Sequence, residues 1–458
     1  MAGSEDTTTQ STADTAGTTD TPGTPRTTNT GHPETAAAAT SSSYVLSPGI
    51  TLLFAVACGS AVANVYFAQP LLVTLGHDFA MSPATLGAVV TLTQVGYGLG
   101  LFFLVPLGDL ADRRRLVAAQ LLLLAAALTL VGTATTGAVL LVGMASVGLL
   151  AVVTQTLVAF AASLAPAARR GRVVGLVTSG VVTGILLART VSGLLADLAG
   201  WRSVYLTSAA LTCVLALTLH RVLPSRALLP HALPPHVPPS RTSAPPATLG
   251  YAPSAPSYGP LLRSTVTLFA RERLLRIRAL LALLIFAAFS TLWSCIALPL
   301  SEPPLSLSDS AIGAFGLAGA AGALAATAAG RLNDRGLSRW TTGVGLVLLA
   351  TSWVPLALTR HSLWALAVGV IVLDLAVQAV HVTNQSLIHT LAPDAGSRLF
   401  GGYMIFYSVG SATGAIASTS LYAVAGWGAV CVLGASFSCL ALLLWAMTER
   451  SSAPPSPR

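Results

Sequence analysis

The chain has 458 residues, of which 53% are hydrophobic and only 9% are charged. Soluble domains carry about a quarter charged residues, so this composition excludes an ordinary soluble protein. The formal net charge of +8 comes from arginine, because the chain contains no lysine. We interpret the arginines as topology signals between membrane spans and expect no nucleic-acid partner.

The first 48 residues are rich in threonine, serine, proline and glycine and have few apolar side chains. Such a segment cannot bury enough apolar surface to fold, so we predict a disordered tail over residues 1–48. It lacks the basic start and short apolar core of a cleavable signal peptide. The first membrane span is therefore expected to target the chain.

Long apolar runs dominate the rest of the sequence. A bilayer core about 30 Å thick is crossed by a helix of roughly 20 apolar residues. We therefore predict an all-α membrane protein with twelve transmembrane helices in two pseudo-symmetric six-helix bundles. The expected spans are 49–74, 84–107, 116–134, 138–164, 173–195, 203–222, 279–300, 311–330, 341–358, 363–389, 399–423 and 427–447.

A Pro-rich segment separates the sixth and seventh spans. The sequence thus predicts an N-terminal bundle over 49–222, a cytoplasmic linker over 223–278, a C-terminal bundle over 279–447 and a tail over 448–458. The linker ends in "RERLLRIR" at 271–278, which we expect to form a short amphipathic helix on the membrane surface.

The arginines also predict the orientation. With the N-terminus inside, the expected outer connections hold only Arg202 and Arg360, and the inner connections and the linker hold many more. Positive charge near span ends stays in the cytoplasm. We therefore expect a multi-pass protein of the bacterial inner (plasma) membrane with both termini cytoplasmic.

Four short phrases recur in the same order in the two halves, with offsets between 222 and 230 residues. This order predicts that the two bundles are related by duplication. The matching pairs are "GDLADR" at 108–113 and "GRLNDR" at 330–335, "LAP" at 164–166 and 391–393, "GVVTG" at 180–184 and "GSATG" at 410–414, and "GW" at 200–201 and 426–427.

The duplicated twelve-span architecture and the G-x-L-x-D-R phrase after the second span resemble the major facilitator superfamily. "ANVYFAQPLL" at 63–72 and "GILLARTVSGLLADLAGW" at 184–201 resemble bacterial efflux permeases of the arabinose-efflux type. The resemblance covers about residues 49–450. It implies a secondary transporter that exports a small organic molecule, such as a drug, metabolite or sugar, by alternating access as a proton antiporter. Proton-coupled import and facilitated diffusion are the alternatives.

The resemblance also implies a conformational latch in the repeated phrase. Gly108 permits a tight loop, and Asp112 can contact the positive N-terminal end of a neighbouring helix. By resemblance that helix is span eleven, which starts near Ser397. The alternative is that the arginines only set topology. The latch candidates are Gly108, Asp112, Arg113, Gly330, Asp334 and Arg335.

Two charged residues lie well inside expected spans, where an ionised side chain is costly and usually functional. Asp374 falls near the middle of span ten, and Gln378, His381 and Gln385 follow on the same helix face. Asp374 and His381 are the candidate proton-coupling residues. An interhelical hydrogen-bond stripe is the alternative interpretation.

Arg189 lies in span five. We expect it to bind an anionic group of the substrate or to pair with Asp374; snorkelling to the outer surface is the alternative. By resemblance, spans one, four, seven and ten line the central pathway. The other candidate substrate-binding residues are Asn64, Tyr66, Gln69, Gln94, Gln155, Trp293, Gln378, Asn384 and Gln385, and Tyr97, Tyr403 and Tyr407 are further candidates.

Several other functions find no support in the sequence. The five cysteines lie in apolar runs without metal-ligand spacing, and there is no G-x-x-x-x-G-K nucleotide loop. We therefore expect no metal, no cofactor and no enzymatic activity. A membrane-embedded lipid transferase and a transporter-like sensor are the rival classes. The expected partners are a small-molecule substrate, protons and the lipid bilayer, and the expected state is a monomer.

Overall fold

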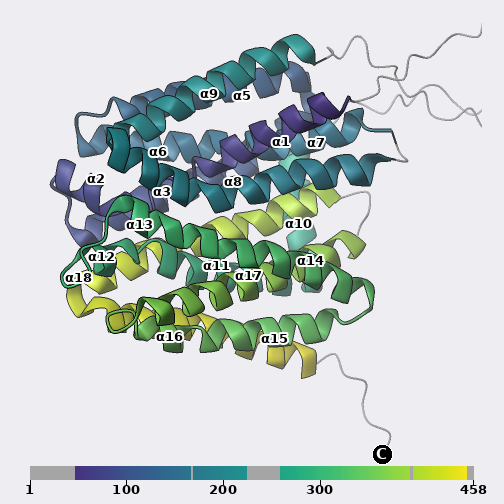
Figure 1. The fold of residues 1–458 in the computed structure, drawn as a ribbon. Helices are drawn as coiled ribbons and strands as arrows, with labels where there is room; N and C mark the ends of the chain where they lie inside the picture. Colours follow the sequence, from purple (N-terminus) through teal and green to yellow (C-terminus); the bar gives the residue numbers. More distant parts are fainter. Residues whose placement is uncertain (1–46, 167–168, 224–257, 392–395, 451–458) are drawn as a thin grey trace, which may run out of the picture. The chain divides into compact units, whose positions relative to one another are not determined.

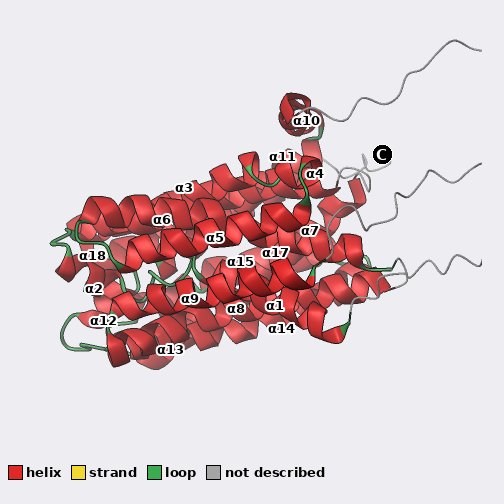
Figure 2. Cartoon of the chain, turned by 90° about the horizontal axis from the view of Figure 1, so that it is seen from above, coloured by secondary structure: helices red, strands yellow, loops and turns green. Residues whose placement is uncertain are grey.

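The computed structural model describes residues 47–166, 169–223, 258–391 and 396–450. The predicted disordered tail falls almost wholly outside these ranges, as does most of the predicted linker. Within them every regular element is a helix, and Figure 2 shows no strand. The all-α expectation is confirmed.

The first half of the chain forms nine helices in the described ranges. They are α1 (Pro48–Ala63), α2 (Leu72–Asp78), α3 (Pro83–Phe103), α4 (Leu107–Leu110), α5 (Arg113–Gly132), α6 (Gly137–Ala151), α7 (Val153–Leu164), α8 (Arg170–Ala199) and α9 (Trp201–Val222).

The second half continues the numbering and includes one 3₁₀ segment. Its elements are α10 (Tyr258–Arg271), α11 (Arg273–Trp293), α12 (Ala297–Ser301), α13 (Asp309–Ala314), η3 (Phe315–Gly319), α14 (Ala320–Asp334), α15 (Ser338–Thr351), α16 (Trp353–Ala357), α17 (Leu363–Leu391) and α18 (Gly396–Arg450).

Nine helical stretches of the described chain are long and apolar enough to cross a membrane. One of them, 401–449, is two spans joined at Gly426, whose backbone leaves the helical region at φ 70°. The short apolar helix α1 and the broken segment from α13 to α14 supply the two others. The twelve predicted spans are thus all present as helices.

Several spans differ from the expected continuous helices. The first ends at Ala63, the fourth is divided at Val152, and the eighth passes through η3 before α14. The "RERLLRIR" segment is not a separate surface helix. Arg271 ends α10, and Arg273 begins the membrane-spanning α11, so the short amphipathic helix lies one segment earlier than predicted.

Side-chain caps fix where several helices begin. Ser47, Ser82 and Thr136 each accept a hydrogen bond from a backbone N–H in the first turn of α1, α3 and α6. Such a cap satisfies one of the N–H groups that have no intrahelical partner. Between α8 and α9 the chain turns at Gly200, whose φ of 79° favours glycine.

The repeated glycine phrases have the same packing role inside each half. In the first half, a Cβ added at Gly180 or Gly184 of α8 would collide with the backbone of α1. In the second half, a Cβ at Gly410 or Gly414 of α18 would collide with the backbone of α11. Both pairs therefore allow close helix approach, and the repeat seen in the sequence is a repeat in packing.

Two ends of the helices are distinguished below (Figure 1). The tail end holds the start of α1 and the ends of α9 and α18, and the distal end holds α2, the end of α8 and the start of α13. Large apolar side chains such as Leu123, Val214 and Leu440 are exposed between these ends. In a membrane protein this surface faces lipid.

Candidate functional site

Arg189 of α8 is buried where the two halves meet, with 2% of its surface exposed. Its Nε donates a 2.6 Å hydrogen bond to Oε1 of Gln69 in the first half. Its Cζ lies 3.9 Å from the centre of the Trp293 ring of α11, in the second half. Tyr66 and Phe289 present their rings at 5.1 and 5.5 Å. The guanidinium is therefore held by an amide and three aromatic faces.

Asp374 of α17 is 5% exposed and contacts the N–H of the same indole. Nε1 of Trp293 donates to Oδ1 of Asp374 over 3.1 Å. Gly319 closes the remaining side, since a Cβ there would lie 2.9 Å from Oδ2. Trp293 thus connects a cation from one half with an acid from the other.

Arg189 and Asp374 do not form a direct ion pair in the part of the chain that the structure describes. Nη2 of Arg189 is buried and has no hydrogen-bond partner among the described residues. A buried donor without an acceptor costs about 1–3 kcal/mol. The expected direct pairing is therefore absent in this conformation, and snorkelling to the surface is ruled out by the burial of Arg189.

A group of tyrosines continues the site toward the tail end. The hydroxyls of Tyr66 and Tyr407 are 2.6 Å apart, which joins the first half to α18. Tyr97 packs against the Tyr407 ring and accepts from Nε2 of Gln155 at 3.4 Å. Tyr66 and Gln69 thus contact Arg189 directly. Gln155 is connected to Tyr66 through Tyr97 and Tyr407.

His381 belongs to a separate polar group on α17. Nδ1 of His381 is 2.8 Å from the Tyr403 hydroxyl, and Nε2 is 2.8 Å from Nε2 of Gln385. Seven residues separate His381 from Asp374, which corresponds to about 10 Å along a helix. The expected stripe is thus divided into two polar groups, and a ring contact between His381 and Tyr407, whose centroids are 6.5 Å apart, connects the second group to the tyrosines of the central site.

The remaining candidates lie away from Arg189. Asn64 is occupied within the first half, where it donates to Ser60 and accepts a 2.6 Å hydrogen bond from Ser208 of α9. Gln94 is buried on α3 with Oε1 unpaired among the described residues, and Gln378 is half-buried on α17. The side chain of Asn64 is therefore engaged within the first half, and its expected contact with the substrate stays a prediction.

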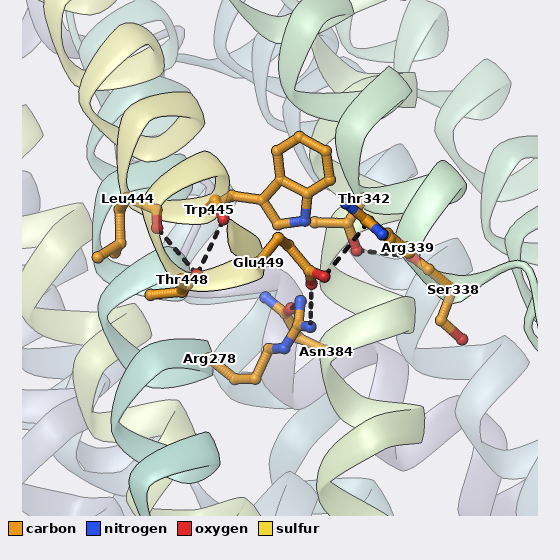
Figure 3. Close-up of polar contacts among 9 residues, drawn as sticks. All are labelled: Arg278, Ser338, Arg339, Thr342, Asn384, Leu444, Trp445, Thr448 and Glu449. Atoms are coloured by element: carbon orange, nitrogen blue, oxygen red, sulfur yellow. Dashed lines mark hydrogen bonds and ion pairs between the residues drawn. The ribbon is translucent and has the colours of Figure 1, made fainter. Parts of the chain in front are cut away.

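Asn384 lies in a charged cluster at the tail end that the sequence analysis missed (Figure 3). Its Oδ1 accepts from Arg278 at 3.3 Å, and Glu449 lies between Arg278 at 3.8 Å and Arg339 at 3.4 Å. Arg278 was assigned to the linker, but it is buried within α11. The cluster joins α11, α15, α17 and α18 of the second half.

A second missed cluster joins the two halves at the distal end. Asp197 of α8 accepts a 3.0 Å hydrogen bond from the backbone N–H of Ser310, in the first turn of α13. Asp309 accepts from Thr74 over 2.6 Å. Burial raises the pKa of Asp309, although the Thr74 hydrogen bond opposes this shift. Thr190 also donates to the Gly313 carbonyl at 3.0 Å.

The latch phrase has a local role in the described structure. Oδ1 of Asp112 accepts from the backbone N–H groups of Arg114 and Arg115, so Asp112 caps its own helix α5. Arg113 donates from Nε to the Gly108 carbonyl at 2.9 Å. The expected contact with span eleven involves side chains near Ser397, which lie outside the described side chains, so that contact stays a prediction.

The second copy of the phrase ends α14. Asp334 and Arg335 are exposed there, and Gly330 is half-buried. Their neighbour Asn333 forms two 3.2 Å hydrogen bonds with Thr383 of α17. The resemblance also implies that Asp334 and Arg335 contact the start of span five, near Gly171 of α8, and this contact stays a prediction.

Groups of three or more metal-ligating side chains do not occur among the described residues. The chemistry of the central site is therefore that of one cation, one acid, an amide and aromatic rings. Such a site can bind a charged organic molecule and can exchange a proton at Asp374.

Comparison with known proteins agrees with this architecture. The profile of the Major Facilitator Superfamily matches residues 52–322 and 278–458. The uncharacterized transporter YgaY of Escherichia coli strain K12 is 43% identical over 406 residues, which cover 89% of this chain and 97% of YgaY. "Probable transporter SCO4007" of Streptomyces coelicolor is 32% identical over 390 residues, 84% of each chain.

Solved structures share the fold at low sequence identity. A bacterial homolog of the human lysosomal transporter Spinster, in an inward-facing and unoccupied conformation, has a TM-score of 0.68 at 15% identity and covers 89% of this chain and 98% of its own. The human organic anion transporter MFSD10 has a TM-score of 0.60 at 17% identity, with 87% and 100% covered. The chain belongs to the Major Facilitator Superfamily and is a membrane transporter.

Proposed function

We propose that the protein is a proton-coupled secondary transporter that moves a small organic molecule across the bacterial inner membrane by alternating access. The observation that supports this proposal is the arrangement of Arg189, Trp293 and Asp374. The cation comes from one half and the acid from the other, so a rocking motion of the halves changes their environment.

Asp374 carries the proton in this proposal. A buried carboxylate can exist in two protonation states, and its surroundings determine which is favoured. Arg189 cannot release its proton in a protein, so it serves as the fixed charge that orients the substrate. The aromatic rings around it supply an apolar wall.

The distribution of contacts supports a conformation that is closed at the distal end. Asp197, Asp309 and Thr190 join α8 or its neighbours to α13 there. At the tail end of α8, a Cβ at Gly171 or Gly175 would meet no described atom within 4 Å. The arginine distribution favours a cytoplasmic tail end that holds both termini, and in that orientation this conformation opens inward.

The direction of transport follows from the relation between proton and substrate. If the substrate competes with the proton for the site, the inward proton gradient drives export by antiport, as the resemblance to efflux permeases implies. If proton and substrate bind together, the same gradient drives uptake. The unpartnered Nη2 of Arg189 favours the second case for an anionic substrate.

Vesicle transport of a panel of drugs, sugars and organic acids tests the proposal. Inside-out and right-side-out vesicles from cells with and without the protein are energised by respiration. We expect at least one compound to accumulate in one orientation only and to leave after a protonophore is added. Accumulation that is insensitive to the protonophore, or equilibration without accumulation, would contradict proton coupling.

A further inference from the structure

We infer that the transported molecule is an organic anion, whose carboxylate or sulfonate binds Arg189 while Asp374 carries a proton. This inference rests on the proposed function and specifies its substrate class. It starts from the one charged group in the described central site that has an unused donor.

Arg189 is prepared for a ligand on one edge of its guanidinium. The Nε edge is occupied by Gln69, and the flat face is covered by Trp293. Nη2 has no acceptor among the residues that the structure describes, although Arg189 is only 2% exposed. A planar guanidinium matches the paired oxygens of a carboxylate or sulfonate, so an anionic group would satisfy the donor that the protein leaves unpaired.

Asp374 does not serve as the acceptor for Nη2 of Arg189. Oδ1 of Asp374 is engaged by the Trp293 indole, and no ion pair with Arg189 forms among the described residues. A cationic ligand would have to enter beside the buried guanidinium, which already occupies the faces of Tyr66, Phe289 and Trp293. The charges therefore favour an anion over a cation, and the rings favour an apolar or aromatic body.

Binding of the anion and of the proton must support one another. An anion at Arg189 brings a negative charge toward Asp374, and like charges disfavour the ionised form of a carboxyl group. The other titratable groups described around Asp374 are Arg189 of α8 and Tyr66 of the segment after α1, with His381 two helical turns away on its own helix. A tyrosine hydroxyl also changes from neutral to negative, but ordinarily only at about pH 10. Asp374 is therefore the group that links proton and anion in cotransport, which an inward gradient drives toward the cytoplasm.

A charge series built on one aromatic ring tests this assignment. The purified protein is reconstituted into liposomes with a trapped pH indicator, and benzenesulfonate, benzenesulfonamide or benzyltrimethylammonium is added outside. Benzenesulfonate stays ionised, so it does not carry protons through the lipid by itself. We expect benzenesulfonate to acidify the lumen and the other two compounds to leave it unchanged.

Arg189→Gln should lower the acidification rate about 30-fold or more, because it removes the guanidinium that forms a buried charge pair with the bound anion. Arg202→Gln, at the distal surface, removes the arginine that lies over the Trp201 ring. The acidification rate of this variant should stay within about twofold of the wild-type rate, because exposed ion pairs such as Arg202–Asp78 contribute little. An Arg189→Gln variant with wild-type acidification would overturn the inference.

The outcomes also separate the inference from the proposed function. Lumenal alkalinisation by benzyltrimethylammonium would leave proton-coupled transport standing and overturn the anionic substrate class. Proton movement with benzenesulfonamide at the rate of benzenesulfonate would do the same. A wild-type protein that moves no protons with any member of the series would count against both proposals.

Discussion

The molecule contains two clusters of one arginine, one tryptophan and one aspartate, and they differ in whether the arginine contacts the aspartate. At the distal surface, Oδ2 of Asp78 accepts from Trp201 at 2.7 Å and from Arg202 at 3.1 Å, and Arg202 lies 4.4 Å from the Trp201 ring centre. In the central cluster, Arg189 and Asp374 each contact Trp293, but they do not contact each other in the described structure.

The presence or absence of the arginine–aspartate pair gives the two clusters different properties. In the distal cluster the cation and acid neutralise each other, and both side chains are partly exposed, 48% for Arg202 and 35% for Asp78. It ties α9 to the end of α2. In the central cluster the direct pair is missing and the unpaired Nη2 is buried. A protein keeps such a costly arrangement where a ligand or proton completes it.

Arg189→Lys should have the largest effect in the comparison. Lysine keeps the charge but loses the planar pair of donors. We expect the exchange rate of benzenesulfonate to fall about tenfold or more, since hydrogen bonds to charged groups contribute about 1.5–3 kcal/mol. Arg202→Lys is the matched control and should remain near the wild type. Equal losses in the two variants would remove the functional distinction between the clusters.

Trp293→Phe should have a smaller effect. Phenylalanine keeps an aromatic face for Arg189 but removes the N–H that reaches Asp374. Since a hydrogen bond contributes about 0.5–1.5 kcal/mol, we expect transport to fall about three- to tenfold. Trp201→Phe makes the same change in the distal cluster, and its transport rate should be unchanged. A normal rate in Trp293→Phe would show that the indole N–H is dispensable.

The smallest effect is expected for Asp78→Asn. The hydrogen bond from Trp201 is the main cause that lowers the pKa of Asp78, and Arg202 adds to it. Its stabilisation is therefore fully present above the unfolded value of about 3.9 and is lost as the pH falls through the lower folded value. At pH 7 the variant should lose less than about 1 kcal/mol.

Thermal unfolding of the detergent-solubilised protein between pH 7 and pH 3 measures this contribution. The wild type and Asp78→Asn should differ at pH 7 and converge below the folded pKa of Asp78. A difference that grows as the pH falls would contradict the assigned shift.

The sequence predicted the fold well because its signals are strong and local. Twenty-residue apolar runs indicate helices without knowledge of their neighbours. The glycine pairs Gly180/Gly184 and Gly410/Gly414 recur with a constant spacing, and they pack equivalent helices in the structure. The breaks at Val152 and η3 were not predicted, because no proline or polar run marks them in the sequence.

The candidate site was predicted in part. Arg189 and Asp374 were predicted as site residues because charged side chains are rare inside membrane spans, and in the structure both contact Trp293. Asn64 stays a prediction as a site residue, and its hydrogen bond with Ser208 shows that the same polar side chain also joins α1 to α9. Asp197 was missed, since an aspartate near a helix end gives no sign that it caps a helix from the other half.

The duplication does not extend to the site. With the offset of 227 that relates the two "LAP" segments, residue 147 corresponds to residue 374, and it is Val147. A symmetric scaffold therefore carries an acid on one side only. This asymmetry is the physical basis for assigning the proton to the second half and the substrate charge to the first.

The most direct measurement compares Asp374→Asn with Asp78→Asn in two assays of reconstituted protein: exchange of labelled benzenesulfonate at equal pH, and its accumulation under a pH gradient. Because asparagine removes the protonatable group but resembles the neutral, protonated form of Asp374, we predict that Asp374→Asn retains exchange and loses accumulation, and that Asp78→Asn retains both. Undiminished accumulation by Asp374→Asn would contradict the proposal that this carboxyl group carries the coupled proton.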